Sequence, residues 1–586
     1  MLALLFVLLI ELLKLLKTII VFYFFTFSMS LFSAGSPLII EGVDGPVKDN
    51  IVAHLELNEG KVPLSILGFP RSNEYILRNV RAALKALGYY SPNLTLSGGH
   101  EQWNLTVDVG LPIRWASINL KLMGEGIGAS LLEDELNEYS FHRGDKLNHG
   151  DYAALKTRLQ SRILELGYFE ANFETSELVV DPDKHEAHLN WSIVLGPRYQ
   201  FGEIAIKGSE LSSSFLKRFY NLSTTDFYDQ ADVIKAQQAL NRSGYFSYVS
   251  IKRVPDTERK KVDVKIELQD REKYELKTSV GYGTDSGGRL GLSWRDRRVN
   301  DSGHNYIASL ELSEISSGID FQYRIPLMEL GDEWINRFSY RLKNEDIARS
   351  KITSIESRWV DKLNDYWSFQ WAATIAAEEI SSNDVIESYL EYLVPSWQVD
   401  YYSLKDPFRV KNGWHWHSVI RLSDERISDP DLQFIQWEQK IKWIYSFNED
   451  WRFLWRFQSG ITDMELDKFI NQMPTTYRFF AGGDTSVRGY EYQSLAPRDG
   501  DGNIIGGRYL LTQSAEIDWE FKDNWRWALF TDAGDAFNHK SDYELSRSVG
   551  MGIRWVTPVG AIRFDVARGL DDPKEWRWHI TIGPDL

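Results

Sequence analysis

The chain has no cysteine, and beyond its first 27 residues it has no long apolar run free of charges. Without cysteine, disulfide bonds, thiolate metal sites and cysteine nucleophiles are excluded. Without a second apolar run, membrane-spanning helices are excluded from the rest of the chain. Any span there has to be built from strands, because only helices and closed β-barrels satisfy their backbone polar groups in lipid.

Positive charge is also in short supply, since 66 Lys and Arg residues face 83 Asp and Glu residues, for a net charge of -17. An acidic chain gains nothing from releasing phosphate counterions, which is the largest contribution to nonspecific nucleic-acid binding. We therefore expect no nucleic acid among the partners. The 11 histidines have no neighbours at metal-ligand spacing and no catalytic constellation is present. We expect no metal site, no cofactor and no enzymatic activity.

Aromatic residues, in contrast, are abundant, with 21 Trp, 28 Tyr and 30 Phe. Tryptophan needs a partner for its indole N–H, which a large core or a wet interface provides, and a membrane boundary is such an interface. The length of 586 residues exceeds what one hydrophobic core usually supports. Several domains are therefore expected.

The N-terminus has the order of a secretory signal peptide. Lys14 and Lys17 come first, an apolar run at residues 18–27 follows, and small residues lead up to Gly35. Residues 1–35 are therefore the predicted signal peptide, which places the chain in the cell envelope. Because residues 1–13 are also mostly apolar, a retained spanning helix of roughly 20 residues is the alternative.

A short motif occurs three times in the first half of the chain. It reads Leu-Gly-Tyr-Tyr at 87–90, Leu-Gly-Tyr-Phe at 166–169 and Ser-Gly-Tyr-Phe at 243–246. The intervals between its glycines are 79 and 77 residues, which indicates one domain copied three times. The predicted copies are residues 36–113, 114–197 and 198–272.

Each copy is predicted to have the order β-α-α-β-β. In the first copy Ile76, Val80 and Leu84 lie on one face of a helix, which the glycine of the motif ends. We interpret the paired aromatics as packing of the helix end onto a sheet. The sheet edges offer unpaired backbone groups, so an extended partner or client is expected to add there as a further strand.

From about Tyr274 to Leu586, apolar and polar residues alternate in segments separated by turn residues. In residues 508–521 one face carries Tyr509, Leu511, Ala515, Ile517, Trp519 and Phe521, and the other carries Thr512, Ser514, Glu516, Asp518 and Glu520. This period of two, with aromatics near the strand ends, is typical of a transmembrane β-barrel. A large soluble β-sandwich or propeller is the alternative. Residues 273–586 are the predicted barrel, and about 20 residues per strand and connection predict roughly 16 strands.

One connection, residues 478–508, combines glycines with an arginine. It contains Gly482, Gly483, Val487, Arg488, Gly489 and Tyr490. The alternation puts Asp532 on the same lumen-facing side as Glu516, so an arginine on a loop folded into the lumen would meet carboxylates. The glycines would let the loop bend and approach the wall. A solvated hairpin tip is the alternative.

The barrel is predicted to have a weak seam. The first strand, about residues 274–283, has to pair with the last, about residues 576–582, because closure hides both edges in lipid. The last strand runs into Gly583 and Pro584, and the first contains Gly281 and Gly283. Proline donates no N–H and glycine packs no side chain, so pairing should be poor there and the seam could part sideways. Simple fraying of a chain end is the alternative.

Together these features resemble the BamA/TamA superfamily of outer-membrane proteins. The resemblance is carried by the Gly482 to Tyr490 loop, the Phe530-x-Asp532-x-Gly534 strand, the hairpin at residues 557–565 and the three β-α-α-β-β copies. The copies resemble the superfamily's POTRA domains. Their number looks most like that of the TamA branch, the outer-membrane subunits of the translocation and assembly module.

The resemblance implies a fold, a location and a function. The fold is three α+β POTRA repeats in the periplasm followed by an all-β, 16-stranded barrel in the outer membrane. An inward loop carries Arg488, which Asp532 of the barrel wall holds, with Phe530, Gly534 and Glu516 as further wall residues. The function is insertion or translocation of outer-membrane proteins such as autotransporters. It implies no enzyme, a TamB-like partner anchored in the inner membrane, and contact with membrane lipid. A transporter that passes an unfolded protein through the lumen, as in two-partner secretion, is the alternative.

Overall fold

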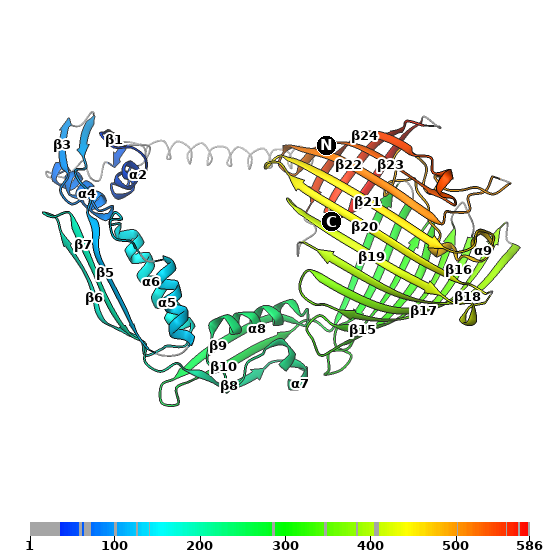
Figure 1. Ribbon diagram of the computed structural model, residues 1–586, viewed down its shortest axis with the longest axis horizontal. Coiled ribbons are helices and arrows are strands. Elements are labelled where there is room, and N and C mark those ends of the chain that lie inside the picture. The colour runs from blue at the N-terminus through cyan, green and yellow to red at the C-terminus, as the bar shows by residue number, and fades with distance from the viewer. Residues whose placement is uncertain are drawn as a thin grey trace, which may run out of the picture. The chain divides into compact units, whose positions relative to one another are not determined.

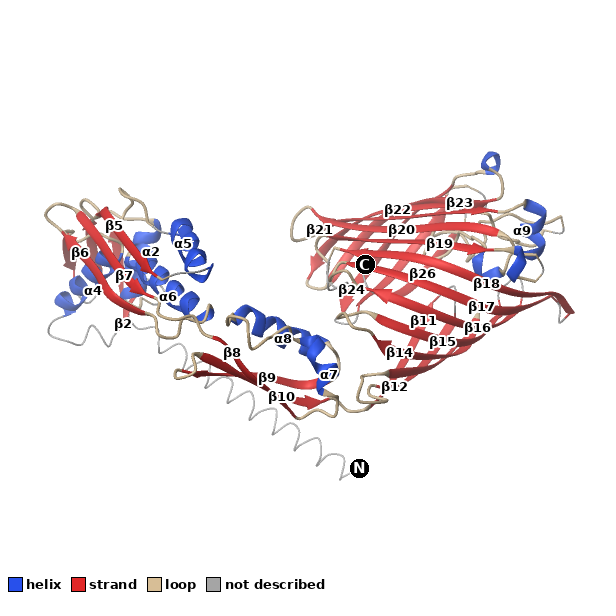
Figure 2. Ribbon diagram, turned by 60° about the horizontal axis from the view of Figure 1, so that its bottom comes forward, coloured by secondary structure: helices blue, strands red, loops and turns tan. Residues whose placement is uncertain are grey.

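The computed structural model describes residues 35–583, except residues 58–60, 64–71, 99–101, 125–126, 140, 284–286, 345–348, 383–384, 404–409, 430, 501, 558–559 and 572–574. The predicted signal peptide apart from Gly35, and Pro584 of the predicted seam, lie outside the described residues. Three small mixed sheets with helices come first along the chain, and one large antiparallel sheet follows (Figure 1, Figure 2).

The first repeat has the predicted order with one additional strand. Its elements are β1 (Gly35–Glu41), α2 (Gly45–His54), β2 (Lys61–Pro63), α4 (Ser72–Ala86), β3 (Asn93–Gly98) and β4 (Trp103–Asp108). The sheet order is β2-β1-β4-β3, with β1 parallel to β4 and the short β2 as the addition. Ile76, Val80 and Leu84 of α4 are fully buried against the sheet, so the helix packs by the face that the sequence marks as apolar.

The second and third repeats share one topology. The second contains β5 (Arg114–Met123), α5 (Ile127–Tyr139), α6 (His149–Glu165), β6 (Asn172–Asp181) and β7 (Glu186–Val194). The third contains β8 (Gln200–Lys207), α7 (Ser213–Leu216), η1 (Lys217–Phe219), α8 (Gln230–Arg242), β9 (Phe246–Asp256) and β10 (Lys261–Asp270). The sheet orders β5-β7-β6 and β8-β10-β9 place the last strand in the middle. None of the helices in the described part of the chain combines the length and apolarity needed to cross a membrane.

The large sheet has sixteen strands in chain order, as predicted. They are β11 (Tyr274–Gly283), β12 (Gly287–Asp296), β13 (Asn305–Ser313), β14 (Ser316–Pro326), β15 (Glu333–Asn344), β16 (Arg349–Asp361), β17 (Trp367–Ser382), β18 (Val385–Tyr402), β19 (Gly413–Ser423), β20 (Phe434–Ser446), β21 (Trp451–Asp463), β22 (Tyr509–Lys522), β23 (Trp525–Phe537), β24 (Ser546–Thr557), β25 (Gly560–Gly569) and β26 (Trp576–Gly583). A single sheet that curls into a nearly closed barrel rules out the soluble β-sandwich, which needs a second sheet over its apolar face.

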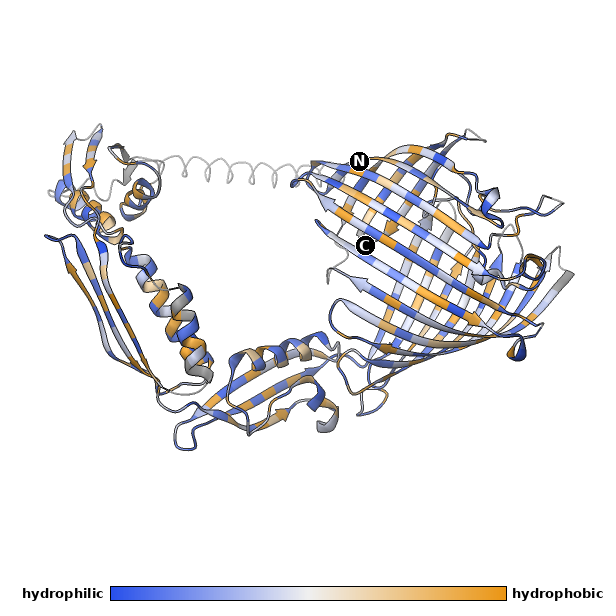
Figure 3. Cartoon of the chain, in the orientation of Figure 1, coloured by the Kyte–Doolittle hydropathy of each residue, from blue (hydrophilic) through white to orange (hydrophobic). Residues whose placement is uncertain are grey.

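Polar and apolar residues alternate along the barrel strands (Figure 3). On β22, Ser514 and Glu516 are buried, whereas Ile517 and Trp519 are exposed. Large apolar side chains are exposed in this way on most of the barrel strands. They form the outward surface that lipid covers in a transmembrane barrel, while the polar residues face the lumen.

The repeated glycine motif joins each repeat to the structure that follows it. Gly88 ends α4 with a φ of +85°, and its carbonyl accepts the N–H of Ile113 at 2.8 Å, where the second repeat begins. Gly167 ends α6 with a φ of +90° and accepts the N–H of Tyr199 at 3.0 Å. In the third copy the acceptor is the carbonyl of Tyr245, which the N–H of Arg271 reaches at 2.8 Å. We call these three contacts the first, second and third joint.

The aromatic pair of the motif takes part in the same joints. Tyr90 packs against the core of the second repeat and shares a 2.7 Å hydrogen bond with His149 Nε2. The ring of Phe169 lies 5.2 Å from that of Tyr199 in the third repeat. The hydroxyl of Tyr245 donates to the carbonyl of Gly303, in the turn between β12 and β13, at 2.5 Å. We interpreted the aromatic pair as packing of a helix end onto its own sheet. That interpretation is incomplete, because the following domain supplies much of the contact of these aromatic side chains.

Candidate functional site

The long connection between β21 and β22 enters the barrel. It begins with α9 (Leu466–Gln472) and the short helix η3 (Thr475–Tyr477). Phe469 of α9 is fully buried in a cluster with Ala376, Leu390 and Phe434 of the barrel wall. These wall residues alternate with exposed, lipid-facing neighbours, so α9 packs on the inner side of the wall.

Two polar contacts hold the start of this connection. Glu378 is fully buried on β17. It accepts one hydrogen bond from the backbone N–H of Thr475 at 3.2 Å and another from the hydroxyl of Thr475. Arg478 donates to the carbonyls of Ile470 and Met473 at the end of α9, both at 2.9 Å. The following residues are thereby directed into the lumen.

Arg488 lies in the lumen with only 3% of its surface exposed, and it meets Asp532 on β23. Its Nε donates to Oδ2 of Asp532 at 2.7 Å, and its Nη2 donates to Oδ1 at 2.9 Å. The backbone N–H of Arg488 also donates to Oδ2, at 3.0 Å. A carboxylate bound by a guanidinium fork and a backbone amide fixes both the side chain and the loop that carries it.

Arg488 also joins two further carboxylates. Its Nη1 donates to Glu516 on β22 at 2.9 Å and to Asp565 on β25 at 3.0 Å. A second arginine, Arg554 on β24, binds the other oxygens of the same two carboxylates. Buried charges are costly unless they are paired and hydrogen-bonded, and this network supplies both conditions.

An aromatic ring completes the arginine site. The guanidinium carbon of Arg488 lies 3.3 Å from the ring centroid of Phe530, a stacking distance. The ring fits because β24 has a glycine beside it, and a Cβ on Gly550 would come within 2.3 Å of the Phe530 ring. Gly534 has a different function, since it lets β23 approach β22, where a Cβ would lie 2.6 Å from the carbonyl oxygen of Leu511.

The loop residues around Arg488 are buried with it. Val487 and Tyr490 are both almost inaccessible, and the Tyr490 hydroxyl donates to the carbonyl of Arg547 at 3.1 Å. Gly482, Gly483 and Gly489 all have φ values between +93° and +98°. Gly489 is the most constrained of these by the wall, because a Cβ there would lie 2.9 Å from backbone atoms of residues 568 and 569. Its N–H is within 3.2 Å of His579 Nε2 on β26.

The alternation of the sequence placed Asp532 and Glu516 on one side, and Arg488 was expected to meet them on a loop folded into the lumen. The structure brings these three together. It adds Asp565, Arg554, Ser514 and His579, which sequence reasoning did not assign to the site. Asp565 and Arg554 fall on the polar face of their strands, so the alternation of polar and apolar residues predicted that they face the lumen. Their convergence on one arginine depends on the strand register, which the sequence does not contain.

The predicted seam residues lie at the two ends of the strand order. Gly281 and Gly283 belong to β11, and Gly583 ends β26, where it pairs with Ala561 of β25. β11 and β26 are the first and last strands of the order, and within the described residues no ladder register joins them. They lie near one another over a short stretch only. Full closure by pairing of the two strands, as expected from the cost of bare edges in lipid, is thus not observed in the described residues.

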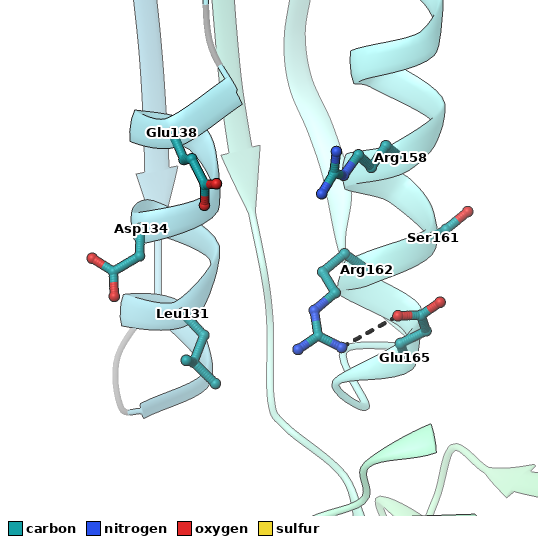
Figure 4. Close-up of a pocket in the computed structure, with 7 residues that line it drawn as sticks. All are labelled: Leu131, Asp134, Glu138, Arg158, Ser161, Arg162 and Glu165. Atoms are coloured by element: carbon teal, nitrogen blue, oxygen red, sulfur yellow. Dashed lines mark hydrogen bonds and ion pairs between the residues drawn. The ribbon is translucent and has the colours of Figure 1, made fainter. Parts of the chain in front are cut away.

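A shallow groove of about 560 Å³ lies outside the barrel, between α5 and α6 of the second repeat (Figure 4). Asp134 and Glu138 line it from α5, and Arg158 and Arg162 line it from α6. Arg162 pairs with Glu165 on its own helix at 3.2 Å. Opposite charges line the two sides of this groove. Among the residues with a described placement, no group of three or more metal-ligating side chains could hold a metal ion.

Family models match the three repeats and the barrel separately. The Omp85 superfamily domain matches residues 273–585, more than half of the chain. The POTRA domain described as TamA domain 1 matches residues 37–111. The POTRA model described as a surface antigen variable number repeat matches residues 116–196 and 199–271.

Individual relatives have low sequence identity to this chain, but the matched regions cover most of it. The outer membrane protein assembly factor BamA of Nitratidesulfovibrio vulgaris is 23% identical over 418 residues, which cover 68% of this chain and 52% of the relative. BamA of Neisseria meningitidis serogroup B is 22% identical over 541 residues, covering 80% of this chain and 66% of the relative. The chain thus spans from about half to two thirds of the length of these relatives.

A solved structure shows the same fold. BamA from Haemophilus ducreyi lacking POTRA domains 1–3 superposes with a TM-score of 0.68 at 16% sequence identity, over 80% of this chain and 99% of that one. Since the barrel model alone matches more than half of the chain, the protein belongs to the Omp85 superfamily, with its β-barrel in the outer membrane and its POTRA domains in the periplasm.

Proposed function

We propose that the protein is an outer-membrane assembly factor that assists the insertion or translocation of β-barrel proteins such as autotransporters. Its central movement is a sideways opening between β11 and β26. The observation that carries the proposal is the strand order, which begins at β11 and ends at β26 without a ladder register between them in the described residues. An unpaired edge presents N–H and C=O groups on which a client strand can form.

The inward loop supports a lateral route. Arg488 and its neighbours hold the loop across the lumen, bound to β22, β23 and β25. An unfolded client would have to displace this network to pass through the lumen, whereas a client at the seam leaves it intact. No covalent reaction and no cofactor belong to this mechanism, because strand pairing and burial of the client's apolar face in lipid supply the free energy.

We further propose that a TamB-like protein anchored in the inner membrane adds a strand to the first repeat. Two observations support this choice. Residues 37–111 match the first POTRA domain of TamA. The sheet of this repeat has β2 and β3 as its edges, and a sheet edge accepts an extended segment through main-chain hydrogen bonds.

A disulfide across the seam tests the lateral route. On β11, Leu276 and Val280 are exposed to lipid, so Lys277 and Ser279 lie on the lumen face. On β26, Trp578 and Ile582 face lipid and Thr581 faces the lumen. Thr581→Cys is therefore combined with Lys277→Cys or with Ser279→Cys in this cysteine-free chain. Once oxidised, the barrel should insert a client into vesicles at least tenfold more slowly, and reduction should restore the rate.

The control disulfide joins two strands that are already paired. Gln439 and Ser459 are direct partners in the β20–β21 register, and their side chains are 3.1 Å apart. Oxidation of Gln439→Cys/Ser459→Cys should leave client insertion unchanged. If the oxidised barrel, locked at the seam, inserts or translocates the client as fast as the protein with reduced cysteines, the lateral route is refuted and passage through the lumen is favoured.

A further inference from the structure

The barrel lumen contains a cavity of about 940 Å³ with a basic lining. Eight of its lining side chains are Arg or Lys and four are Asp or Glu, in a chain whose net charge is -17. The cavity reaches from β20 and β21 to Arg289 on β12 and Thr581 on β26, on either side of the seam. The lining of this cavity thus has the opposite sign to the chain as a whole.

Most of the acidic lining residues already have cationic partners. Glu516 and Asp565 are bound by Arg488 and Arg554. Glu438 is bound by Arg421 at 3.0 Å and by Lys440 at 2.8 Å. Even when every acidic residue of the lining is counted, an excess of positive charge faces the cavity.

Two cationic side chains in this lining lie directly opposite each other. Lys442 of β20 is the register partner of Arg456 of β21. Opposite residues of an antiparallel pair have Cβ atoms about 4.5 to 5.5 Å apart, and like charges at that distance destabilise the pair. Arg456 donates to the neutral hydroxyl of Ser514 at 3.0 Å. The charges of Arg488 and Arg563 act against that of Arg456, while the carboxylates of Asp532 and Glu516 act in its favour.

We infer that this cavity binds a phosphate group, either free or as part of a lipid headgroup that enters through the seam. A phosphate carries negative charge and several strong acceptor oxygens. Lys442 and Arg456 on neighbouring strands form a matching pair of cationic donors. An anion between Lys442 and Arg456 replaces their repulsion with attraction to a common partner. This site is independent of client insertion, because it rests on the lumen charges alone.

The test compares the wild-type protein with Lys442→Gln/Arg456→Gln in a non-ionic maltoside detergent. Thermal unfolding is followed with sodium phosphate, glycerol 3-phosphate or phosphatidylglycerol in mixed micelles, each against sodium chloride at equal ionic strength. A ligand that binds the folded state raises Tm. The wild-type Tm should rise with at least one phosphate compound, and the double variant should lose the shift or need at least tenfold more ligand for it.

A matched control removes the same charge from exposed positions. The side chain of Arg426 is 86% exposed, and Lys540 is exposed as well. Arg426→Gln/Lys540→Gln should keep the wild-type response. Each variant is compared with its own Tm in chloride, because Lys442→Gln/Arg456→Gln removes both a repulsion and the interaction of Arg456 with Asp532 and Glu516. Lys442→Gln alone, which keeps the Arg456 contact to Ser514, provides the same comparison if the double variant does not fold.

The three compounds separate the sources of the phosphate. A shift with phosphatidylglycerol alone assigns the site to a lipid headgroup, and a shift with the two soluble compounds alone assigns it to free phosphate. A shift with all three supports a site for the phosphate group itself. The inference is overturned if none of them shifts the wild type, or if the shift is unchanged when Lys442 and Arg456 are replaced.

Discussion

The guanidinium of Arg488 binds the carboxylates of Glu516, Asp532 and Asp565, and its plane lies against the ring of Phe530. These contacts use the Nε, Nη1 and Nη2 donors of the planar guanidinium together. A lysine has the same charge but a single ammonium, so it can neither form the fork to Asp532 nor stack on the ring in the same way. The site therefore depends on the shape of arginine as much as on its charge.

Arg488→Lys should destabilise the barrel by about 1 to 3 kcal/mol, the range for leaving a buried acceptor without its hydrogen bond. It should also release the loop, because the backbone contact to Asp532 depends on the same carboxylate position. Urea unfolding followed by tryptophan fluorescence measures the first effect, and protease cleavage within residues 482–505 measures the second. Arg498→Lys, at an exposed position of the same loop, should change neither. An Arg488→Lys barrel with the wild-type urea midpoint would show that the network does not hold the loop.

His149 makes the first joint sensitive to pH. Burial and the nearby Lys85 lower the pKa of this histidine, so the folded state favours its neutral form. The unfolded state, with a pKa near the ordinary value of about 6.5, binds more protons once the pH falls below that value. The stabilisation is therefore complete above about pH 6.5 and decreases as the pH falls towards the lowered folded pKa.

We expect the first and second repeats to become less firmly joined at about pH 5.5 than at about pH 7.5. Spin labels on Asp49→Cys and Glu177→Cys, at exposed positions of the two repeats, measure the distribution of distances across the joint. The distribution should broaden in acid for the native His149 and respond less in His149→Gln. A distribution that broadens equally in His149→Gln would assign the effect to another group.

At the scale of the elements, the joints explain why the repeated motif needs glycine. A Cβ on Gly88 would lie 2.2 Å from the carbonyl oxygen of Leu147 in the second repeat. Gly244, with a φ of +77°, has nothing within 4 Å of the same position. Alanine at either site would have to adopt a positive φ, which costs about 1 to 3 kcal/mol. At Gly88 it also forces the two repeats apart.

Gly88→Ala should therefore broaden the distance distribution between the Asp49→Cys and Glu177→Cys labels, whereas Gly244→Ala should leave that distribution unchanged. Limited proteolysis should show faster cleavage at residues 109–112 in Gly88→Ala than in Gly244→Ala. Equal cleavage in the two variants would mean that backbone strain alone, and not contact with the following repeat, determines the effect.

The sequence predicted the elements well where one residue pattern decides them. Lipid on one side and water on the other impose a strict alternation, so the polar face of β22 and the strands β11 and β26 could be located from residue parity and turn residues. The joints were not predicted, because the partner of the Gly88 carbonyl is Ile113, which lies in the next repeat. Asp565 and Arg554 were not assigned to the arginine site for a similar reason, since β24 and β25 bring them there only through the register of the barrel.

At the scale of the whole molecule, the repeats have separate cores. Leu105 and Val80 belong to the core of the first repeat, and Ile113 and Trp115 belong to that of the second. Ile113 lies within the predicted first copy, residues 36–113, but its side chain packs in the second core. A deletion that removes only the first repeat should therefore end at Leu111.

Deletion of residues 36–111 should abolish binding to the proposed TamB-like partner and leave the barrel folded. The physical reason is that the deletion removes the edges β2 and β3 but none of the buried residues of the second core, against which Tyr90 alone of the described deleted residues packs. Co-purification with the partner measures binding, and the shift in gel mobility between unheated and boiled samples measures barrel folding. Unchanged co-purification would place the partner contact on another repeat.

The inward loop also gives the barrel wall an uneven stiffness. Glu516, Asp532, Asp565 and His579 attach one loop to β22, β23, β25 and β26. Strand length does not distinguish the two sides of the seam, because β11 and β12 have 10 residues each and β25 and β26 have 10 and 8. The two sides differ in their contacts with the loop, so we expect β11 to be the edge that moves while the loop holds β26. Amide hydrogen exchange should be faster in β11 to β13 than in β22 to β26, and a growing client would have a stationary template on one side and a yielding wall on the other.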